Sequence, residues 1–280
     1  MRSSLDREVL HQALVTPGSP WRRVTVHAEV DSTNAELARS GVLWDVVVAD
    51  HQTAGRGRFG RSWEDVPRAS VAVSALLPMP ESGPGWLPLV TGLALHRAIG
   101  EVAGLVTGLK WPNDVLAEAD GWRKVCGVLC EVVPAGVVVG AGINVSQDRE
   151  ELPVDTATSL RLCGAGEVGR EALITAYLSH LASLHAALTG PYAGQRAVQD
   201  AYRSACLTIG AEVDLHEGPP GVERPSRRVV ATGIDGQGRL TVKGPGGEEA
   251  IAAGDVVHVR TQGVAGHGAG SPPGSAASES

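Results

Sequence analysis

Cysteine is scarce in this sequence, and the four cysteines that occur show no CxxC spacing: Cys126, Cys130, Cys163 and Cys206. A chain of 280 residues can bury a core large enough to be stable without disulfide bonds. We therefore expect a reducing compartment and a cytoplasmic protein. Residues 1–20 hold no apolar run of signal-peptide length. The most apolar stretch, 127–143, is interrupted by Glu131, Pro134 and several glycines, so we expect no membrane span.

An excess of positive charge is also missing, because 24 lysines and arginines stand against 31 aspartates and glutamates. The resulting net charge of −7 disfavours nonspecific attraction to nucleic acid or to an anionic membrane. Hydrophobic residues make up 43% of the chain, which is ordinary for a globular protein. We expect one large domain with a small one appended.

Hydrophobic periodicity predicts the order of helices and strands. Thr33, with Glu36 three residues later, suits the start of a short helix that ends at Gly41. Further along, the pattern predicts strands over 46–49 and 70–77, a helix over 87–102, a hairpin of strands 125–133 and 137–143, and helices over 167–188 and 195–206.

The region beyond Gly210 has a different pattern. Short apolar runs separated by Gly, Pro and Asp turns predict a β-barrel of about fifty residues, with strands over 211–215, 228–234, 240–242 and 256–259. The last residues hold too little apolar surface to repay ordering. We predict an N-terminal extension (1–23), a main domain (24–208), a small barrel (209–262) and a disordered tail (263–280).

The segment from Gln52 to Trp63 alternates glycines with arginines: Gly55, Arg56, Gly57, Arg58, Gly60 and Arg61. It matches the GxGxxG pattern and also the P-loop pattern, except that Arg61 stands where the P-loop requires lysine. Both patterns require a helix directly afterwards, and Pro67 and a strand follow instead. Backbone amides and guanidinium groups can still form a cradle for phosphate or carboxylate. Because a glycine-rich loop is costly to order, we expect it to close over a ligand. A solvated surface loop is the alternative for this segment taken alone.

Lysine is rare in the chain, which has only Lys110, Lys124 and Lys243. Two of them lie in one short region, which favours a chemical need for an ammonium group, although a lysine at a strand edge is usually just solvated. Between these two, Pro112 fixes a turn that presents Asn113 and Asp114, and such a turn alone carries no function.

The predicted strand that ends at Asn144 contains Gly140 and Gly142. Glycines inside a strand allow a ligand or another backbone to approach closely. A strand bulge with a solvent-facing Asn144 explains the same pattern, so this segment alone does not decide between the two.

Taken together and in this order, the segments resemble the catalytic core of the biotin protein ligases over residues 24–188. The resemblance lies in Asp31-Ser32-Thr33-Asn34, the glycine- and arginine-rich loop with Arg61 and Trp63, the run from Lys110 to Asp114, Lys124 with Gly127, and Gly142-Ile143-Asn144. It implies an α+β fold, with a mixed, mainly antiparallel sheet and packed helices as in class II synthetases. A small SH3-like β-barrel would follow this core.

The resemblance also implies roles for individual residues. Biotin would be bound by Ser32, Thr33, Asn34, Gln52, Arg56, Gly57, Arg58, Lys124 and Gly127. ATP and the adenylate would be bound by Gly55, Arg56, Arg58, Arg61, Trp63, Asn113, Asp114 and Asn144. Lys124 and Arg58 are the candidate catalytic residues, and no metal ligand is assigned. Phe59 stands where some relatives carry a basic residue, so the loop has less positive charge here.

The implied reaction uses ATP to activate biotin as an acyl adenylate and then attaches biotin to a protein lysine. Mg²⁺ would neutralise the leaving pyrophosphate, and the partner would be a biotin carboxyl carrier protein domain of a biotin-dependent carboxylase. We expect no nucleic-acid or membrane partner. Residues 1–23, interrupted by Pro17, Gly18 and Pro20, are too short for the winged helix that makes some relatives repressors.

Two alternatives differ in kind. A lipoate ligase resembles this family in fold and adenylates another small carboxylic acid, but its motifs match the glycine- and arginine-rich loop less well. A nucleic-acid-binding regulator could use the same arginines without catalysis, although the acidic net charge disfavours it.

Overall fold

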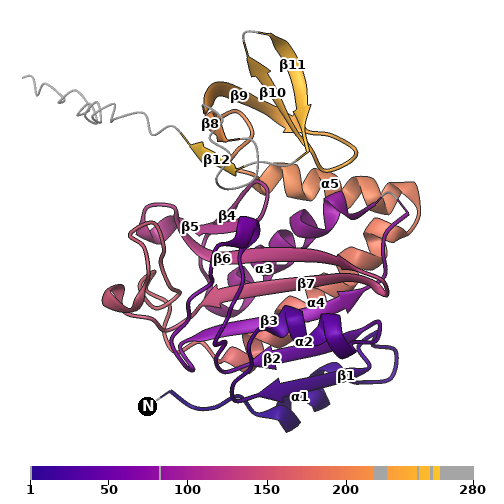
Figure 1. Cartoon of the computed structure of the whole chain (residues 1–280), viewed down its shortest axis with the longest axis vertical. Coiled ribbons are helices and arrows are strands. Elements are labelled where there is room, and N and C mark those ends of the chain that lie inside the picture. Colours follow the sequence, from indigo (N-terminus) through magenta and orange to yellow (C-terminus); the bar gives the residue numbers. More distant parts are fainter. Residues whose placement is uncertain (1, 82, 217–225, 245, 253–254, 259–280) are drawn as a thin grey trace, which may run out of the picture.

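The computed structural model describes residues 2–81, 83–216, 226–244, 246–252 and 255–258. These residues form a large sheet flanked by helices and a smaller sheet at one end of it (Figure 1). The predicted tail over 263–280 lies outside the described residues. Short 3₁₀ helices interrupt the connections at Arg58–Gly60, Pro84–Trp86, Glu118–Asp120 and Arg149–Glu151.

The large sheet has seven strands in the order β1-β2-β3-β7-β6-β5-β4. Strands β1 and β2 pair in parallel, and every other neighbouring pair is antiparallel. The strands span β1 (Arg23–His27), β2 (Asp45–Ala49), β3 (Ser70–Leu77), β4 (Thr107–Lys110), β5 (Asp114–Ala117), β6 (Arg123–Val133) and β7 (Gly136–Asn144).

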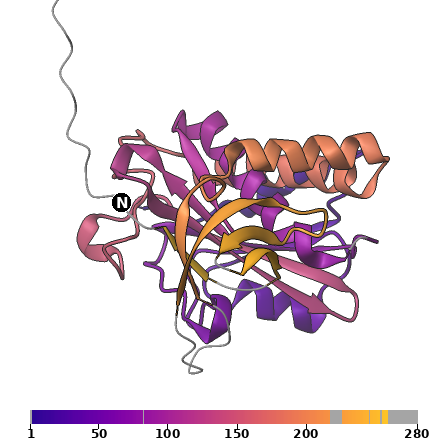
Figure 2. The same ribbon diagram turned by 90° about the horizontal axis from the view of Figure 1, so that it is seen from above.

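The helices are divided unequally between the two faces of this sheet. One face carries α1 (Arg7–Leu14), α3 (Leu87–Ala103), α4 (Arg170–Thr189) and α5 (Tyr192–Ala205). Among the α-helices of the described residues, the other face carries only α2 (Thr33–Ser40), which packs on β2, β3 and β7 (Figures 1 and 2). Most of this second face is therefore left for loops.

Side-chain alternation along β7 explains this division. Val139 and Ile143 belong to the core beneath α3 and α4, whereas Val138 points to the opposite face and packs with the residues under α2. Gly140 and Gly142 share the face of Val138, because successive side chains of a strand point to opposite sides. On this face β7 is thus apolar under α2 and bare of side chains at Gly140 and Gly142, which leaves space for a cavity.

The start of α2 differs from the prediction by one residue. Ser32 is the N-cap, and its hydroxyl accepts a hydrogen bond from the Ala35 backbone amide. Thr33, predicted as the cap, is the first helical residue. The predicted capping box is therefore wrong, and the Thr33 hydroxyl is available for a contact in the functional site.

The N-terminal segment packs against the main domain through the same hydrophobic core. Leu10 and Leu14 of α1 are buried, and so is Trp21. Arg170 of α4 holds this segment in place, because its Nη2 lies 2.8 Å from Asp50 Oδ1 and donates to the Ser3 carbonyl at 2.5 Å. The division of the chain into an extension and a main domain remains a prediction.

The smaller sheet contains β8 (Glu212–His216), β9 (Arg227–Ile234), β10 (Leu240–Gly244), β11 (Gly247–Ile251) and β12 (Asp255–His258). Its order is β11-β10-β9-β8-β12, all antiparallel. The turn between β9 and β10 docks on the main domain: Trp86 Nε1 donates to the Gly236 carbonyl at 2.9 Å, and Trp111 Nε1 donates to the Gly238 carbonyl at 3.1 Å.

Helix α4 is long and apolar enough to cross a membrane by length and composition alone, contrary to the expectation from the sequence. Half of its apolar window is buried inside the protein, where α4 packs on α3 and α5. Packing in the core accounts for this composition.

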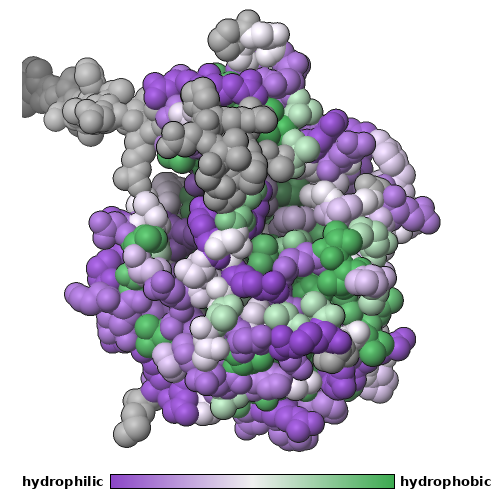
Figure 3. Space-filling view, viewed as in Figure 1, coloured by the Kyte–Doolittle hydropathy of each residue, from purple (hydrophilic) through white to green (hydrophobic). Residues whose placement is uncertain are grey.

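Hydrophilic residues spread over much of the face seen in the space-filling view (Figure 3).

Candidate functional site

A cavity of about 750 Å³ opens on the part of the second face that α2 leaves uncovered. Its walls come from the start of α2, the glycine- and arginine-rich loop, strands β5, β6 and β7, the segment 153–157 and strand β12. Every residue predicted as a site residue from the sequence lines this cavity except Gly55. In particular, Arg58 and Lys124 share it.

The glycine- and arginine-rich loop is folded as a tight hairpin rather than an irregular strand connection. The Gly57 amide donates to the Arg61 carbonyl at 2.7 Å, and the Trp63 amide donates to the Gly55 carbonyl at 2.9 Å. The presence of glycine at position 55 has a structural reason, because a Cβ there would lie 2.4 Å from the Trp63 carbonyl oxygen. It supports the hairpin without lining the cavity.

Phe59 occupies the tip of this hairpin in the left-handed region, with a φ of 57°. Its ring lies 4.6 Å from the Arg58 guanidinium carbon and 6.0 Å from that of Arg61. Stacking of guanidinium groups on an aromatic face is favourable. Phe59 adds no charge to the loop, but it positions the two arginines beside it.

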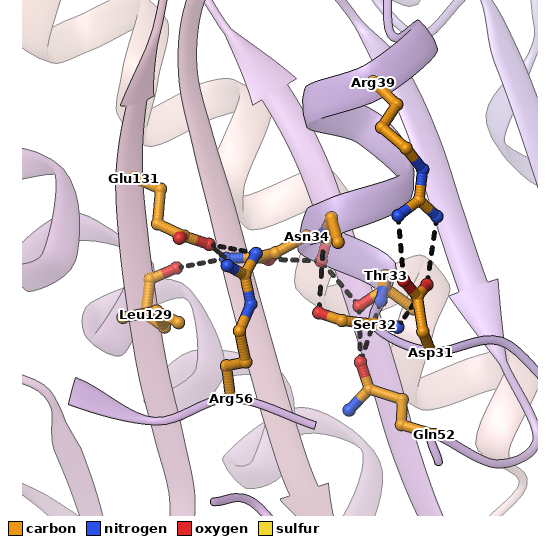
Figure 4. Close-up of polar contacts among 11 residues, drawn as sticks. Asp31, Ser32, Thr33, Asn34, Arg39, Gln52, Arg56, Leu129 and Glu131 are labelled. Atoms are coloured by element: carbon orange, nitrogen blue, oxygen red, sulfur yellow. Dashed lines mark hydrogen bonds and ion pairs between the residues drawn. The ribbon is translucent and has the colours of Figure 1, made fainter. Parts of the chain in front are cut away.

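Polar side chains gather where α2 begins, and we call Ser32, Thr33, Asn34 and Gln52 the α2 corner (Figure 4). Thr33 donates to Gln52 Oε1 through its backbone amide at 2.9 Å and its hydroxyl at 3.1 Å. Ser74 supports the corner from β3: its buried hydroxyl lies 2.7 Å from Thr33 Oγ1 and 2.6 Å from Asn34 Oδ1. These side chains therefore have fixed orientations.

Lys124 and Asp114 form a second polar group in the cavity. Its Nζ lies 2.6 Å from Asp114 Oδ1, with the two side chains 32% and 19% exposed. On a regular strand Lys124 and Gly127 would face opposite sides of β6. The register of β5 against β6 shifts between Val115 and Leu116, which leaves Val125 as an extra, bulged residue. The bulge lets both Lys124 and Gly127 face the cavity, a re-aiming typical of bulges near functional sites.

Trp63 lies against the bare part of the sheet. A Cβ on Gly142 would lie 2.4 Å from its Cε2, and one on Gly127 would lie 2.9 Å from its Cζ3. Lys124 Nζ lies 5.7 Å from the centre of the same ring. Gly127 and Gly142 therefore admit an aromatic side chain. The sequence predicted a close approach of a ligand or another backbone at Gly140 and Gly142, whereas the structure places the Asn34 amide at Gly140 and the Trp63 ring at Gly142.

The two predicted asparagines are anchored by the backbone around them. Asn113 lies in the turn between β4 and β5, after a cis peptide bond between Trp111 and Pro112, and its Nδ2 donates to the Val128 carbonyl at 2.9 Å. Arg58 Nη1 donates to Asn113 Oδ1 at 3.3 Å. Asn144 is 5% exposed, and its Nδ2 donates to the Thr158 carbonyl at 2.9 Å. Asn144 does not face solvent, so the bulge alternative for it is wrong.

A metal cage made of protein side chains is absent from the described part of the chain, where no three His, Cys, Asp or Glu side chains cluster. The oxygen donors that line the cavity include the carboxylates of Asp114 and Glu64 and the amides of Asn113 and Asn144. One or two carboxylates with neutral oxygens suit Mg²⁺ that is held mainly by nucleotide phosphates. The residues therefore fit Mg²⁺ entering with a nucleotide.

The sequence reasoning missed several residues of this site. Ser74 lies inside an apolar strand, and Glu131 interrupts another apolar strand, so a polar residue in a hydrophobic run was the available signal for both. Ser74 and Glu131 contact residues that line the cavity, whereas Val256 and Val257 of the smaller sheet line it directly. Nothing in their sequence distinguishes them from ordinary strand residues.

Two protein-family models match parts of this chain. Residues 32–148 match the model of the biotin/lipoate A/B protein ligase family, and residues 222–259 match that of the biotin protein ligase C terminal domain. The biotin–acetyl-CoA-carboxylase ligase of Mycobacterium tuberculosis is 39% identical over 93% of this chain and 98% of that protein. The bifunctional ligase/repressor BirA of Bacillus subtilis is 33% identical over 62% of this chain and 54% of that protein.

Solved structures that resemble this chain are biotin protein ligases as well. The biotin protein ligase from Aquifex aeolicus in complex with biotin and ATP matches with a TM-score of 0.71 and 29% identity, over 86% of this chain and 100% of that one. The Leishmania major enzyme in complex with biotinyl-5-AMP matches with a TM-score of 0.59 and 25% identity, over 82% and 98%. These matches confirm the predicted α+β fold with its small C-terminal sheet. The chain belongs to the biotin protein ligase family.

Proposed function

We propose that this protein activates biotin with ATP to biotinyl-5'-AMP and transfers the biotinyl group to a lysine of a biotin carboxyl carrier protein domain. The observation that carries the proposal is the shared cavity, where a polar corner at α2 meets Arg58 and Lys124. The names of the relatives and the biotin and ATP complexes of the structural neighbours support the same reaction.

The first step joins an anion to a polyanion. The biotin carboxylate attacks the α-phosphorus of ATP, the bond from that phosphorus to the bridging oxygen breaks, and pyrophosphate leaves with the electron pair. Cations held at the junction lower this barrier, because negative charge accumulates on the phosphoryl oxygens. Lys124 and Arg58 are the candidates, and both are already oriented, by Asp114 and by Asn113 with Phe59.

Recognition of biotin is assigned to the α2 corner. The bicyclic head of biotin carries a ureido group with both donors and a carbonyl acceptor, which suits a corner of hydroxyl and amide side chains. Ser32, Thr33 and Asn34 are each less than 5% exposed, so a ligand group that contacts them would lie in a largely desolvated space. Discrimination is strong when a site is built to hydrogen-bond a ligand group.

Mg²⁺ would be held by Asp114, Asn113 and Asn144, and it would neutralise charge on the phosphates of the nucleotide. Trp63 and Arg61 line the same cavity and are assigned to the nucleotide.

Transfer to the carrier needs no nucleophile from the enzyme. The neutral amine of the target lysine attacks the acyl carbon, AMP leaves with the electron pair of the broken acyl–phosphate bond, and the amine loses a proton. The hairpin loop over the cavity would exclude water until the carrier arrives, because the mixed anhydride is labile. We assign the protein to the cytoplasm, where its carrier substrates would be made.

Biotin-dependent exchange of labelled pyrophosphate into ATP is the decisive test. Exchange should require biotin and should not occur with lipoate, which separates the two acids that ligases of this fold activate. Biotin should also raise the melting temperature, in proportion to RT ln(1 + [L]/Kd). Exchange that is equal with lipoate, or absent with biotin, would refute the proposal.

A further inference from the structure

Glu131 connects the loop hairpin to the α2 corner. It lies on β6, and its Oε2 accepts a hydrogen bond from Asn34 Nδ2 at 2.7 Å and one from Arg56 Nη2 at 3.0 Å (Figure 4). One carboxylate oxygen therefore joins a strand, a helix start and a loop. None of the roles assigned above involves Glu131.

Asn34 itself is held firmly. Its Nδ2 also donates to the Leu129 carbonyl at 3.2 Å, and its Oδ1 lies 2.6 Å from the Ser74 hydroxyl. A Cβ on Gly140 would lie only 2.0 Å from Asn34 Oδ1, so the amide sits directly on the backbone of β7. Asn34 is therefore a rigid support on which the Glu131 carboxylate is oriented.

Arg56 is the more exposed partner of Glu131. Its side chain is 45% exposed and that of Glu131 is 30% exposed. An isolated ion pair with this exposure stabilises a fold little. Here Asn34 already fixes the carboxylate, so when the ion pair forms only the Arg56 side chain loses conformational freedom. The adjoining Gly57 lets the loop backbone adjust to the position of Arg56.

We propose that Glu131 is a positioning residue that docks the loop hairpin on the α2 corner through Arg56. Loop closure and occupation of the corner are then coupled, because a ligand that touches Asn34 stabilises the carboxylate that holds Arg56. The kinetic part of this inference rests on the proposed function, whereas the docking of the loop does not.

Amide hydrogen exchange in the ligand-free protein tests the docking alone. The amides of Gly57 and Trp63 are hydrogen bonded in the closed hairpin, so a peptide covering 55–63 reports its opening. Glu131→Gln should accelerate exchange in this peptide about tenfold, and Asp214→Asn should not. Asp214 is a matched control, since its side chain is 31% exposed and pairs with Arg228 at 3.1 Å outside the cavity. The factor of ten corresponds to about 1.4 kcal/mol, one charge-assisted hydrogen bond.

Kinetics test the coupling. Glu131→Gln should raise the biotin KM about tenfold, the same hydrogen-bond factor, with kcat changed much less, because Glu131 does not touch the reacting atoms. In an Arg56→Gln background, Glu131→Gln should have little further effect on loop exchange, since the pair is already broken. Glu131→Asp should recover part of the docking.

The outcomes are distinguishable. If Glu131→Gln leaves both loop exchange and biotin KM within twofold of the parent, the inference is wrong. If the two substitutions are additive in loop exchange, the docking does not pass through Arg56 and the inference is also wrong. If the parent shows no biotin-dependent exchange of pyrophosphate while Glu131→Gln still opens the loop, the proposed function fails and the docking stands.

Discussion

Lys124 Nζ lies 2.6 Å from Asp114 Oδ1, and this pair spans two neighbouring strands at the floor of the cavity. The bulge at Val125 directs the lysine to this side of the sheet. Asp114 holds the ammonium group in place before any ligand arrives, and an incoming anion can then share it. A preorganised cation of this kind needs little rearrangement during a reaction.

Lys124→Ala should lower biotin-dependent pyrophosphate release by about 10²–10³-fold, the loss typical of removing one group that stabilises transition-state charge. Lys124→Arg should recover only part of the rate, because a planar guanidinium cannot take the position of a compact ammonium group. Lys243→Ala is the control, since Lys243 is exposed on β10. Near-normal turnover of Lys124→Ala would remove this residue from its assigned role.

Gly142→Ala should weaken nucleotide binding without unfolding the protein. A methyl group there would lie 2.4 Å from Trp63 Cε2, so the indole must move away from the sheet. We expect the ATP KM to rise by about tenfold or more, as for other losses of a packed aromatic contact. Gly166→Ala is the control, because a Cβ at Gly166 meets nothing within 4 Å. An unchanged ATP KM would show that Trp63 does not contact the nucleotide.

The long elements could be predicted from the sequence because burial and periodicity agree in them. Strand 70–77 was predicted with the bounds that β3 has, and the helix predicted over 87–102 differs from α3 by one residue. The short strands β4 and β5 were missed. Four residues are too few for a periodic pattern, and their pairing is set by the turn around Pro112 and by tertiary contacts.

The composition of the site was easier to predict than its geometry. The alternation of glycine and arginine, the scarcity of lysine and the family resemblance indicated the loop arginines and Lys124, and the cavity contains them. The side of β6 that Lys124 faces depends on a bulge, which a regular period-2 pattern cannot reveal. Glu131 was overlooked because its meaning depends on Asn34 and Arg56, which are distant in sequence and meet it only in the fold.

Lowering the pH should weaken the docking of β12. Burial, and to a lesser degree the charge of Lys110, lowers the pKa of His258 to about 4, while its Nε2 lies 3.1 Å from Thr208 Oγ1. In the unfolded chain its pKa is about 6.5. Between these values the unfolded state binds the extra proton, so stability that is present above pH 6.5 is lost as the pH falls toward 4.

His258→Gln should reduce this loss, because glutamine keeps a polar group near Thr208 and does not titrate. The measurement is the melting temperature of parent and variant at pH 7.5 and at pH 5.0. All other titrating groups are common to both proteins, so the difference between the two shifts reports His258. Equal shifts would mean that His258 is protonated in the folded protein as easily as in the unfolded chain.

The buried pair of Arg170 and Asp50 should be a main anchor of the N-terminal segment. The two side chains are 8% and 6% exposed, and the Leu5 amide donates to the same carboxylate at 3.2 Å. Asp50→Ala should lower the free energy of unfolding by about 3–5 kcal/mol, because it leaves an uncompensated guanidinium in the core.

Replacing both residues, as in Asp50→Leu with Arg170→Met, should cost less than Asp50→Ala, since no charge is then buried alone. Arg39→Ala, which removes an exposed pair with Asp31, should shift the urea midpoint far less. The measurement is urea unfolding of the parent, Asp50→Ala, the double variant and Arg39→Ala. A double variant less stable than Asp50→Ala would show that the pair contributes through its hydrogen bonds to the N-terminal backbone rather than through charge neutralisation.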